Sequence, residues 1–160
     1  MNKYVFFCLL LITICGATSF LPVNKNDDEA TIENTINSKH YSFKASTATP
    51  LSGGLIQLSG SNYDLVVSPK TIQCNLPFFG RAYSAPYGSS DGGIKFASTD
   101  FEYSVKKKSK RGWSILIKPN DNSDVRLLTL NVSKSGYASL TVISNNRQQM
   151  FFGGTIAATK

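Results

Sequence analysis

The chain has 160 residues, of which 41% are hydrophobic and 17% are charged, and 17 Lys and Arg stand against 10 Asp and Glu. This length favours one domain, which can bury about two-thirds of its chain's surface without a metal or a disulfide. The hydrophobic content excludes a disordered chain, and 12 Gly with 6 Pro exclude collagen-like and low-complexity classes.

Residues 1–19 are predicted to be a secretory signal peptide. Lys3 precedes an apolar or near-apolar run of 12 residues, from Tyr4 to Cys15, and small residues follow it. Such a run matches the ~7–15-residue core of an export signal and is shorter than the ~20 residues of a spanning helix. We expect cleavage after Ser19 and an exported chain, periplasmic or extracellular, with no transmembrane span.

Cys15 offers an alternative, in which the chain is a lipid-anchored envelope protein. A lipoprotein signal is cut just before the cysteine that takes the lipid, and the preceding residue is usually small, whereas Ile14 stands here.

Cleavage after Ser19 would leave Cys74 as the one cysteine of the mature chain. One cysteine can form neither an internal disulfide nor a cysteine-rich zinc site, and we expect Cys74 to be a small buried side chain.

Residues 20–27 are predicted to be a flexible tether and residues 28–38 a short helix. Asp28 and Glu29 suit the positive end of a helix dipole. The apolar residues recur near helical spacing, so one face of the helix can pack on the rest of the domain. These apolar residues are Ala30, Ile32 and Ile36.

After Lys39 the pattern changes to the alternation of apolar and polar residues that is typical of strands with one buried face. The clearest alternating stretches are residues 41–45, 101–106, 113–118, 128–132 and 138–142. Turn residues separate them at spacings of about 8–12 residues, as in a sandwich or a barrel. We expect residues 28–160 to be one all-β domain, an antiparallel meander of about eight to ten strands closed as a barrel or sandwich.

Three blocks of sequence carry a resemblance to a known family. They are Leu76-Pro77-Phe78-Phe79-Gly80, Asn146-Arg147-Gln148 and Phe152-Gly153, in that order. Together they resemble a bacterial envelope family known only as a domain of unknown function, DUF4251, over about residues 28–157. The resemblance implies an export or lipoprotein signal, a short helix and a compact barrel or sandwich of lipocalin-like size. It implies no established activity, cofactor or catalytic residue.

The segment from Leu76 to Tyr87 is the most unusual of the chain. It holds four aromatic residues, and Pro77 and Pro86 bar it from a central strand. One interpretation is an irregular segment that covers one barrel end, with Arg81 paired to a carboxylate or to carbonyls. The other is a rim where aromatic rings hold an apolar or sugar ligand and an arginine fixes an anionic group. The candidate ligand-binding residues are Phe78, Phe79, Arg81, Tyr83, Tyr87 and Arg147.

A second candidate surface is basic. Residues 106–111 hold five positive charges in six residues, between two alternating stretches. One interpretation is a solvated hairpin tip that discourages edge-to-edge pairing. The other is contact with an anionic surface, such as lipid phosphates or an acidic polysaccharide. The candidate contact residues are Lys106, Lys107, Lys108, Lys110 and Arg111. Aromatic and basic residues are not interleaved as in a single-strand-binding site, and we expect no nucleic acid partner.

Patterns that would carry catalysis are weak. Residues 88–92 match the G-x-S-x-G of hydrolases, but a strand-like stretch follows where that mechanism needs a helix, and His40 precedes the serine. A catalytic thiol at Cys74 would need a nearby histidine. Residues 120–124 are polar but lack the glycine and the glutamate of a calcium loop, so we expect a hairpin turn. No metal and no cofactor are expected.

These observations favour a non-enzymatic exported domain that binds a small apolar or amphipathic ligand or an envelope component. The alternative is a structural or protein-interaction module of the cell envelope without a pocket. A small hydrolase that uses a serine or Cys74 is a remote third hypothesis. Whether side chains fill the barrel interior or leave it open is the observation that should separate the first two hypotheses.

Overall fold

The computed structural model describes residues 25–60, 62–83, 92–108 and 112–159, and for residues 25–28 it describes the backbone alone. In these ranges one helix, α2 (Lys25–Ser38), precedes ten strands of a single sheet. The strands are β1 (Tyr41–Pro50), β2 (Ile56–Gln57), β3 (Asp64–Val67), β4 (Ile72–Leu76), β5 (Ile94–Ser98), β6 (Phe101–Lys108), β7 (Gly112–Pro119), β8 (Val125–Val132), β9 (Tyr137–Ser144) and β10 (Met150–Ala158).

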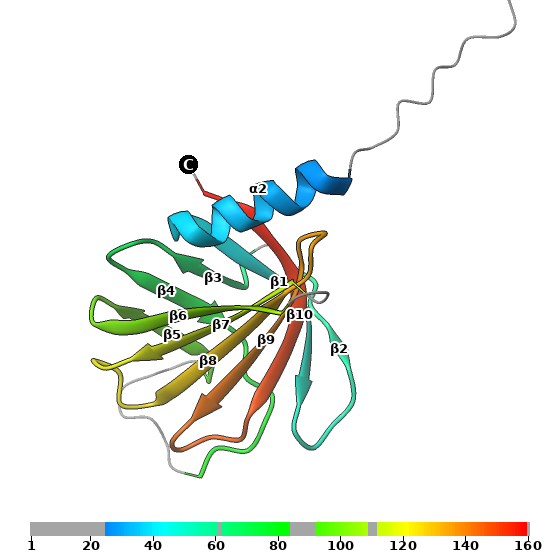
Figure 1. The fold of residues 1–160 in the computed structure, drawn as a ribbon. Helices are drawn as coiled ribbons and strands as arrows, with labels where there is room; N and C mark the ends of the chain where they lie inside the picture. The colour runs from blue at the N-terminus through cyan, green and yellow to red at the C-terminus, as the bar shows by residue number, and fades with distance from the viewer. Residues whose placement is uncertain (1–24, 61, 84–91, 109–111, 160) are drawn as a thin grey trace, which may run out of the picture.

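The strands form an antiparallel sheet in the order β5-β4-β3-β1-β10-β9-β8-β7-β6, and β2 pairs with β1 beside this path. The sheet curls into a nearly closed barrel (Figure 1), which confirms the expected all-β architecture. The first and last strands are neighbours, paired from Tyr41 opposite Ala158 to Pro50 opposite Met150. The two ends of the path are therefore β5 and β6, which follow one another along the chain.

Side chains of the sheet fill the inside of the barrel. In β7, Trp113, Ile115 and Ile117 are buried, whereas Leu116 between them is 39% exposed. The same alternation in the other long strands brings large, fully buried side chains together. They include Tyr41, Phe43, Leu65, Leu130, Leu140 and Phe152. This interior is packed as a hydrophobic core, unlike a barrel that keeps a central ligand cavity.

Helix α2 lies across one end of the barrel (Figure 1). Ile36 is fully buried and Ile32 packs against the core, as the helical spacing predicted, but Ala30 is exposed. The reason is angular: at 100° per residue, positions 32 and 36 lie close to one line along the helix and position 30 lies far from it. The hydroxyl of Tyr103 donates a hydrogen bond of 3.2 Å to the carbonyl of Ile36 and secures the end of the helix.

The helix begins at Lys25, three residues before the predicted start and inside the predicted tether. The acidic residues Asp27 and Asp28 thereby fall in its first turn. That position favours negative side chains, because the first backbone N–H groups of a helix carry partial positive charge.

Asp121 holds the corner between β5 and β6. Its carboxylate accepts hydrogen bonds from the hydroxyl of Ser98 at 2.5 Å and from the backbone N–H groups of Thr99 at 2.9 Å and Asp100 at 3.3 Å. These bonds, that of Ser98 first, lower the pKa of Asp121 below its ordinary value. In the same turn Asn122 accepts from two backbone N–H groups. Residues 120–124 are therefore a hairpin turn, as predicted.

We expect the variant Asp121→Asn to melt at a lower temperature than the native chain at neutral pH. A carboxyl group with a lowered pKa stabilises the folded state above its unfolded pKa, and this contribution is lost as the pH falls through the folded pKa. The difference in Tm should therefore shrink as the pH is lowered below about 4. Thermal unfolding followed by circular dichroism across this range checks it, and a difference that stays constant with pH would contradict the assignment.

Gly154 allows a close approach of two strands, where β10 passes a bulge of β1 between Ala45 and Thr47. A β-carbon at position 154 would overlap the carbonyl oxygen of Lys44. The variant Gly154→Ala should therefore lower the free energy of unfolding by about 1–3 kcal/mol. Gly54→Ala is the matched control, because a β-carbon at Gly54 meets no atom within 4 Å. Equal urea midpoints for the two variants would contradict this explanation.

Candidate functional site

The aromatic segment, Leu76 to Tyr87, is described as far as Tyr83. Its residues 77–83, which follow β4, lie at the end of the barrel opposite α2 (Figure 1). Their backbone runs beside residues 146–148 of the β9–β10 turn. Gln148 donates its N–H to the carbonyl of Arg81 at 2.9 Å, and Tyr83 donates to the carbonyl of Asn146 at 2.7 Å. These bonds attach the segment to the barrel without making it a central strand, which agrees with the restriction imposed by its prolines.

Arg147 joins three parts of the chain at this end. Nη1 donates to the carbonyls of Gly92 and Gly93, both at 2.9 Å, and Nη2 lies 3.0 Å from the carboxylate of Asp124. The guanidinium also lies over the ring of Phe78, 5.4 Å from its centroid. The side chain is only 6% exposed. A planar guanidinium carries several N–H donors in fixed directions, so one side chain can bind the carboxylate and both carbonyls. The single ammonium group of a lysine could not reach all of these acceptors in the same way.

The structure gives Arg147 the pairing that was one of the two interpretations for Arg81. The pairing with carbonyls and a carboxylate that we expected of Arg81 is made by Arg147, whereas the side chain of Arg81 is exposed. Arg147, a candidate for fixing an anionic ligand, has both terminal nitrogens bound to the protein. The sequence alone could not show which arginine is buried and paired, because Arg81 and Arg147 both follow turn-like segments. Only the fold determines which acceptor groups lie near each guanidinium.

A hollow of about 260 Å³ opens beside Phe78, where the ends of β3, β4 and β5 meet. Its lining residues are Tyr63, Leu76, Pro77, Phe78, Gly92, Gly93 and Lys95. The carbonyls of the two glycines are the ones that Arg147 binds, so the arginine holds one wall of the hollow in place. Its volume is slightly below the ~300–1,000 Å³ of typical ligand pockets, which limits it to a small ligand or group.

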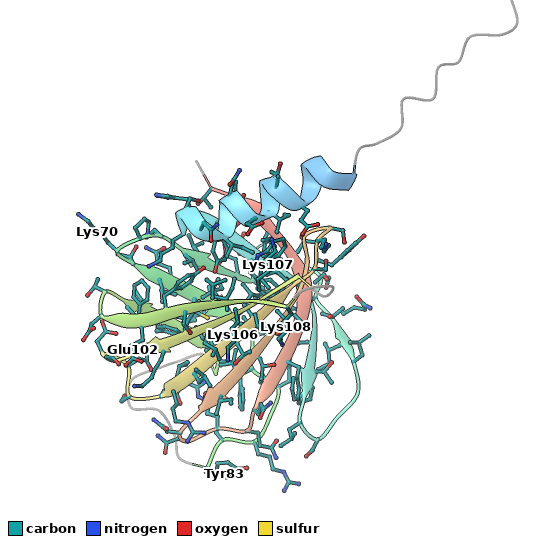
Figure 2. All side chains as sticks on the ribbon, in the orientation of Figure 1. Lys70, Tyr83, Glu102, Lys106, Lys107 and Lys108 are labelled. Carbon is teal, nitrogen blue, oxygen red and sulfur yellow. The ribbon has the colours of Figure 1, made fainter. Side chains whose placement is uncertain are left out.

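The predicted ligand-binding set is thus divided by the structure. Phe78 lines the hollow, and Arg147 is buried. Phe79 and Tyr83 are exposed on the outer surface, where Figure 2 shows Tyr83 at the lower edge of the molecule. Tyr87 lies outside the described residues. The prediction missed the contributions of Tyr63 and Lys95, which join the hollow only through the pairing of β3, β4 and β5.

The basic segment is only partly a free hairpin tip. Lys107 lies 2.7 Å from Glu33 of α2 and 4.0 Å from Glu29, and it stands over the ring of Trp113. The hydrogen bond with Glu33 is the main reason that the pKa of Lys107 is raised. Lys106 is exposed, and Lys108 donates to Asn131 at 3.4 Å. Lys110 and Arg111 lie outside the described residues.

The hydrolase candidates are not assembled into a site where the structure describes them. Cys74 is buried in β4, and burial is the main cause that raises the pKa of its thiol, which opposes formation of the reactive thiolate. His40 is exposed at the end of α2. The serines of the G-x-S-x-G match lie outside the described residues. Over the described part of the chain, no three His, Cys, Asp or Glu side chains gather to hold a metal ion.

A filled antiparallel barrel with a helix across one end defines the class of this protein, a small all-β domain. The family model of a domain of unknown function (DUF4251) matches residues 24–156, and the chain belongs to this family, as the sequence blocks predicted. A solved crystal structure, a DUF4251 family protein from Bacteroides eggerthii DSM 20697, is similar with a TM-score of 0.55 and 18% identity. The likeness covers 84% of this chain and 87% of that one and shows the fold.

No curated protein matches the chain. Helix α2, the one helix within the described residues, is neither long nor apolar enough to cross a membrane.

We expect Arg147→Ala to lower the free energy of unfolding by about 3 kcal/mol, because it leaves the carboxylate of Asp124 and the carbonyls of Gly92 and Gly93 without their buried partner. Arg81→Ala is the matched control and should change stability by less than about 0.5 kcal/mol, since that side chain is exposed. Urea unfolding of both variants measures the difference. Similar losses for both arginines would show that Arg147 is not the structural tie described here.

Proposed function

We propose that this chain is a non-enzymatic binding domain, which takes a small apolar or amphipathic group in the hollow opposite α2. The single observation that carries the proposal is the hollow itself, with its aromatic walls at the end of a barrel whose interior is filled. Because side chains occupy the interior of the barrel, the proposed ligand site is at the end of the barrel and not inside it.

The lining of the hollow suits an amphipathic ligand. Tyr63 and Phe78 offer apolar ring surfaces, and Lys95 adds a polar ammonium group to the same lining. Arg147 supports the site from behind through the carbonyls of Gly92 and Gly93. A wall that is held in place before binding loses less conformational freedom when a ligand arrives.

An export signal at residues 1–19 supports a role outside the cytoplasm, in the periplasm or beyond it. The 12-residue apolar run after Lys3 supports this placement, with cleavage after Ser19 or a lipid anchor at Cys15 as its two forms. The buried thiol of Cys74, with its raised pKa, supports a binding role over a cysteine-dependent hydrolase.

The filled interior favours a second candidate, a protein-interaction or structural module of the envelope. Phe79 and Tyr83 are 45% and 71% exposed beside Arg81, and aromatic and arginine side chains are enriched where proteins bind each other. In this candidate the outer surface of the aromatic segment contacts the partner, and the hollow remains empty.

Gly92→Phe separates the two candidates. Gly92 lines the hollow and a β-carbon there meets no atom within 4 Å, so phenylalanine at this position adds a bulky ring to the lining without a clash at the β-carbon. The probe is anilinonaphthalene sulfonate, an anionic aromatic dye whose rings match the aromatic side chains of the lining. We expect the native chain to enhance the dye's fluorescence and Gly92→Phe to weaken its binding at least about tenfold, equivalent to about 1.4 kcal/mol.

Gly54→Phe is the matched control, because Gly54 is equally open and lies in the β1–β2 turn, which does not line the hollow. It adds the same apolar ring away from the hollow and should leave dye binding unchanged. Native mass spectrometry of the chain isolated from cells tests for a bound molecule independently. Absence of both a bound mass and dye binding at the hollow would reject the ligand proposal and favour the interaction module.

A further inference from the structure

The barrel end that carries α2 holds most of the excess positive charge of the described residues. Strand β3 ends opposite Tyr41, directly after the helix, so the β3–β4 turn with Lys70 lies at this end. Strand β6 ends with Lys106, Lys107 and Lys108, and Lys107 contacts Glu33 of the helix; Figure 2 shows these lysines well apart from Lys70. Lys39 follows the helix, and Lys134 pairs with it. Against these six lysines stand two described carboxylates, Glu29 and Glu33.

Those two carboxylates are already occupied by the lysines that hold the helix. Glu29 lies 2.6 Å from Lys134 and Glu33 lies 2.7 Å from Lys107. Glu29 and Glu33 therefore make no ion pair with the other lysines of this end, which are Lys39, Lys70, Lys106 and Lys108. Residues 25–28, whose side chains are not described, add one Lys and two Asp at the start of the helix. This addition reduces the excess of positive charge without removing it.

An exposed aromatic ring accompanies the lysines. Tyr137 begins β9 beside the turn that carries Lys134, and it is 69% exposed. A β-carbon added at the preceding Gly136 would lie 3.4 Å from Ile32 of the helix, so this turn belongs to the helix-bearing end. Tyrosine combines an apolar ring with a polar hydroxyl, which suits the boundary between lipid headgroups and water.

We propose that the helix-bearing end of the barrel docks on an anionic phospholipid bilayer. Charge complementarity is the main argument, since lysines near a bilayer are attracted to its acidic headgroups. The exposed ring of Tyr137 adds a side chain suited to the bilayer interface at the same end. The docking face is distinct from the hollow at the opposite end.

The distribution of the lysines favours a bilayer over an acidic polymer. They come from the helix end and from the β3–β4, β6–β7 and β8–β9 hairpins, spread around one end of the barrel. Such a distribution suits a surface that meets the whole end at once. A linear polymer is usually bound along a continuous basic groove, as single-stranded nucleic acids are. In the docked orientation the hollow and the aromatic segment point away from the lipid and remain open to other molecules.

The first experiment measures sedimentation of the full chain, isolated as cells process it, with vesicles of equimolar phosphatidylcholine and phosphatidylglycerol. Vesicles of phosphatidylcholine alone are the neutral comparison. We expect tighter binding to the anionic vesicles and a loss of that difference in high salt, which screens exposed charges. The double variant K106E/K108E should weaken binding to anionic vesicles at least about thirtyfold. It leaves Lys107 and Lys134, which hold the helix, in place.

K118E/R126E is the matched control for net charge. Lys118 and Arg126 are exposed strand residues beside the β7–β8 turn, away from the helix-bearing end, and the exchange changes the total charge by the same amount. This variant should retain most of the binding. Equal weakening by the two double variants would overturn the proposal, because it would show attraction by net charge alone. Binding to an acidic polysaccharide but not to the vesicles would overturn it in favour of a polymer.

The second experiment tests orientation with two tyrosines of nearly equal exposure at opposite ends, Tyr137 at 69% and Tyr83 at 71%. Each is replaced by cysteine and labelled with an environment-sensitive fluorophore, while the buried Cys74 remains protected. On anionic vesicles the label at position 137 should shift to the blue and be quenched by brominated lipid, and the label at 83 should not. The reverse pattern, or equal changes at both positions, would reject the proposed orientation.

Discussion

The pairing of the first and last strands is the constraint on which the rest of this structure depends. When β1 pairs with β10, the two halves of the meander become one curled sheet, and the inward side chains of both halves share one core. Gly154 permits that pairing, since any side chain there would collide with the backbone of Lys44. The pairing also leaves β5 and β6 as the free ends of the path, and Asp121 binds the backbone N–H groups of Thr99 and Asp100 in the turn that joins them.

A filled barrel presents its chemistry at its ends, and the two ends of this one differ. At one end, lysines outnumber carboxylates around a helix held by ion pairs and by two buried or half-buried isoleucines. At the other end, aromatic side chains surround a small hollow whose wall is fixed by Arg147. The proposed ligand and the proposed membrane surface therefore use separate parts of the molecule, so one could be bound without displacing the other.

Much of the fold could be predicted from the sequence, because alternation reports burial directly and turn residues mark where strands stop. The strands at 113–118 and 138–142 are examples. The candidate site was harder to predict. Phe78 was found from its unusual neighbourhood, but the sequence does not show that Tyr63 and Lys95 share the hollow with it. These residues are far apart along the chain, and only the register of β3, β4 and β5 brings them together.

By itself the sequence determined the all-β class, the helix before the first strand, the family and the buried state of Cys74, because each depends on local pattern or on local polarity. Tertiary structure alone decided which arginine is a structural tie and which is exposed, and that Lys107 binds the helix. The physical reason is that a charged side chain takes its role from its partners. Arg147 meets Asp124 and two carbonyls, whereas the side chain of Arg81 extends into solvent.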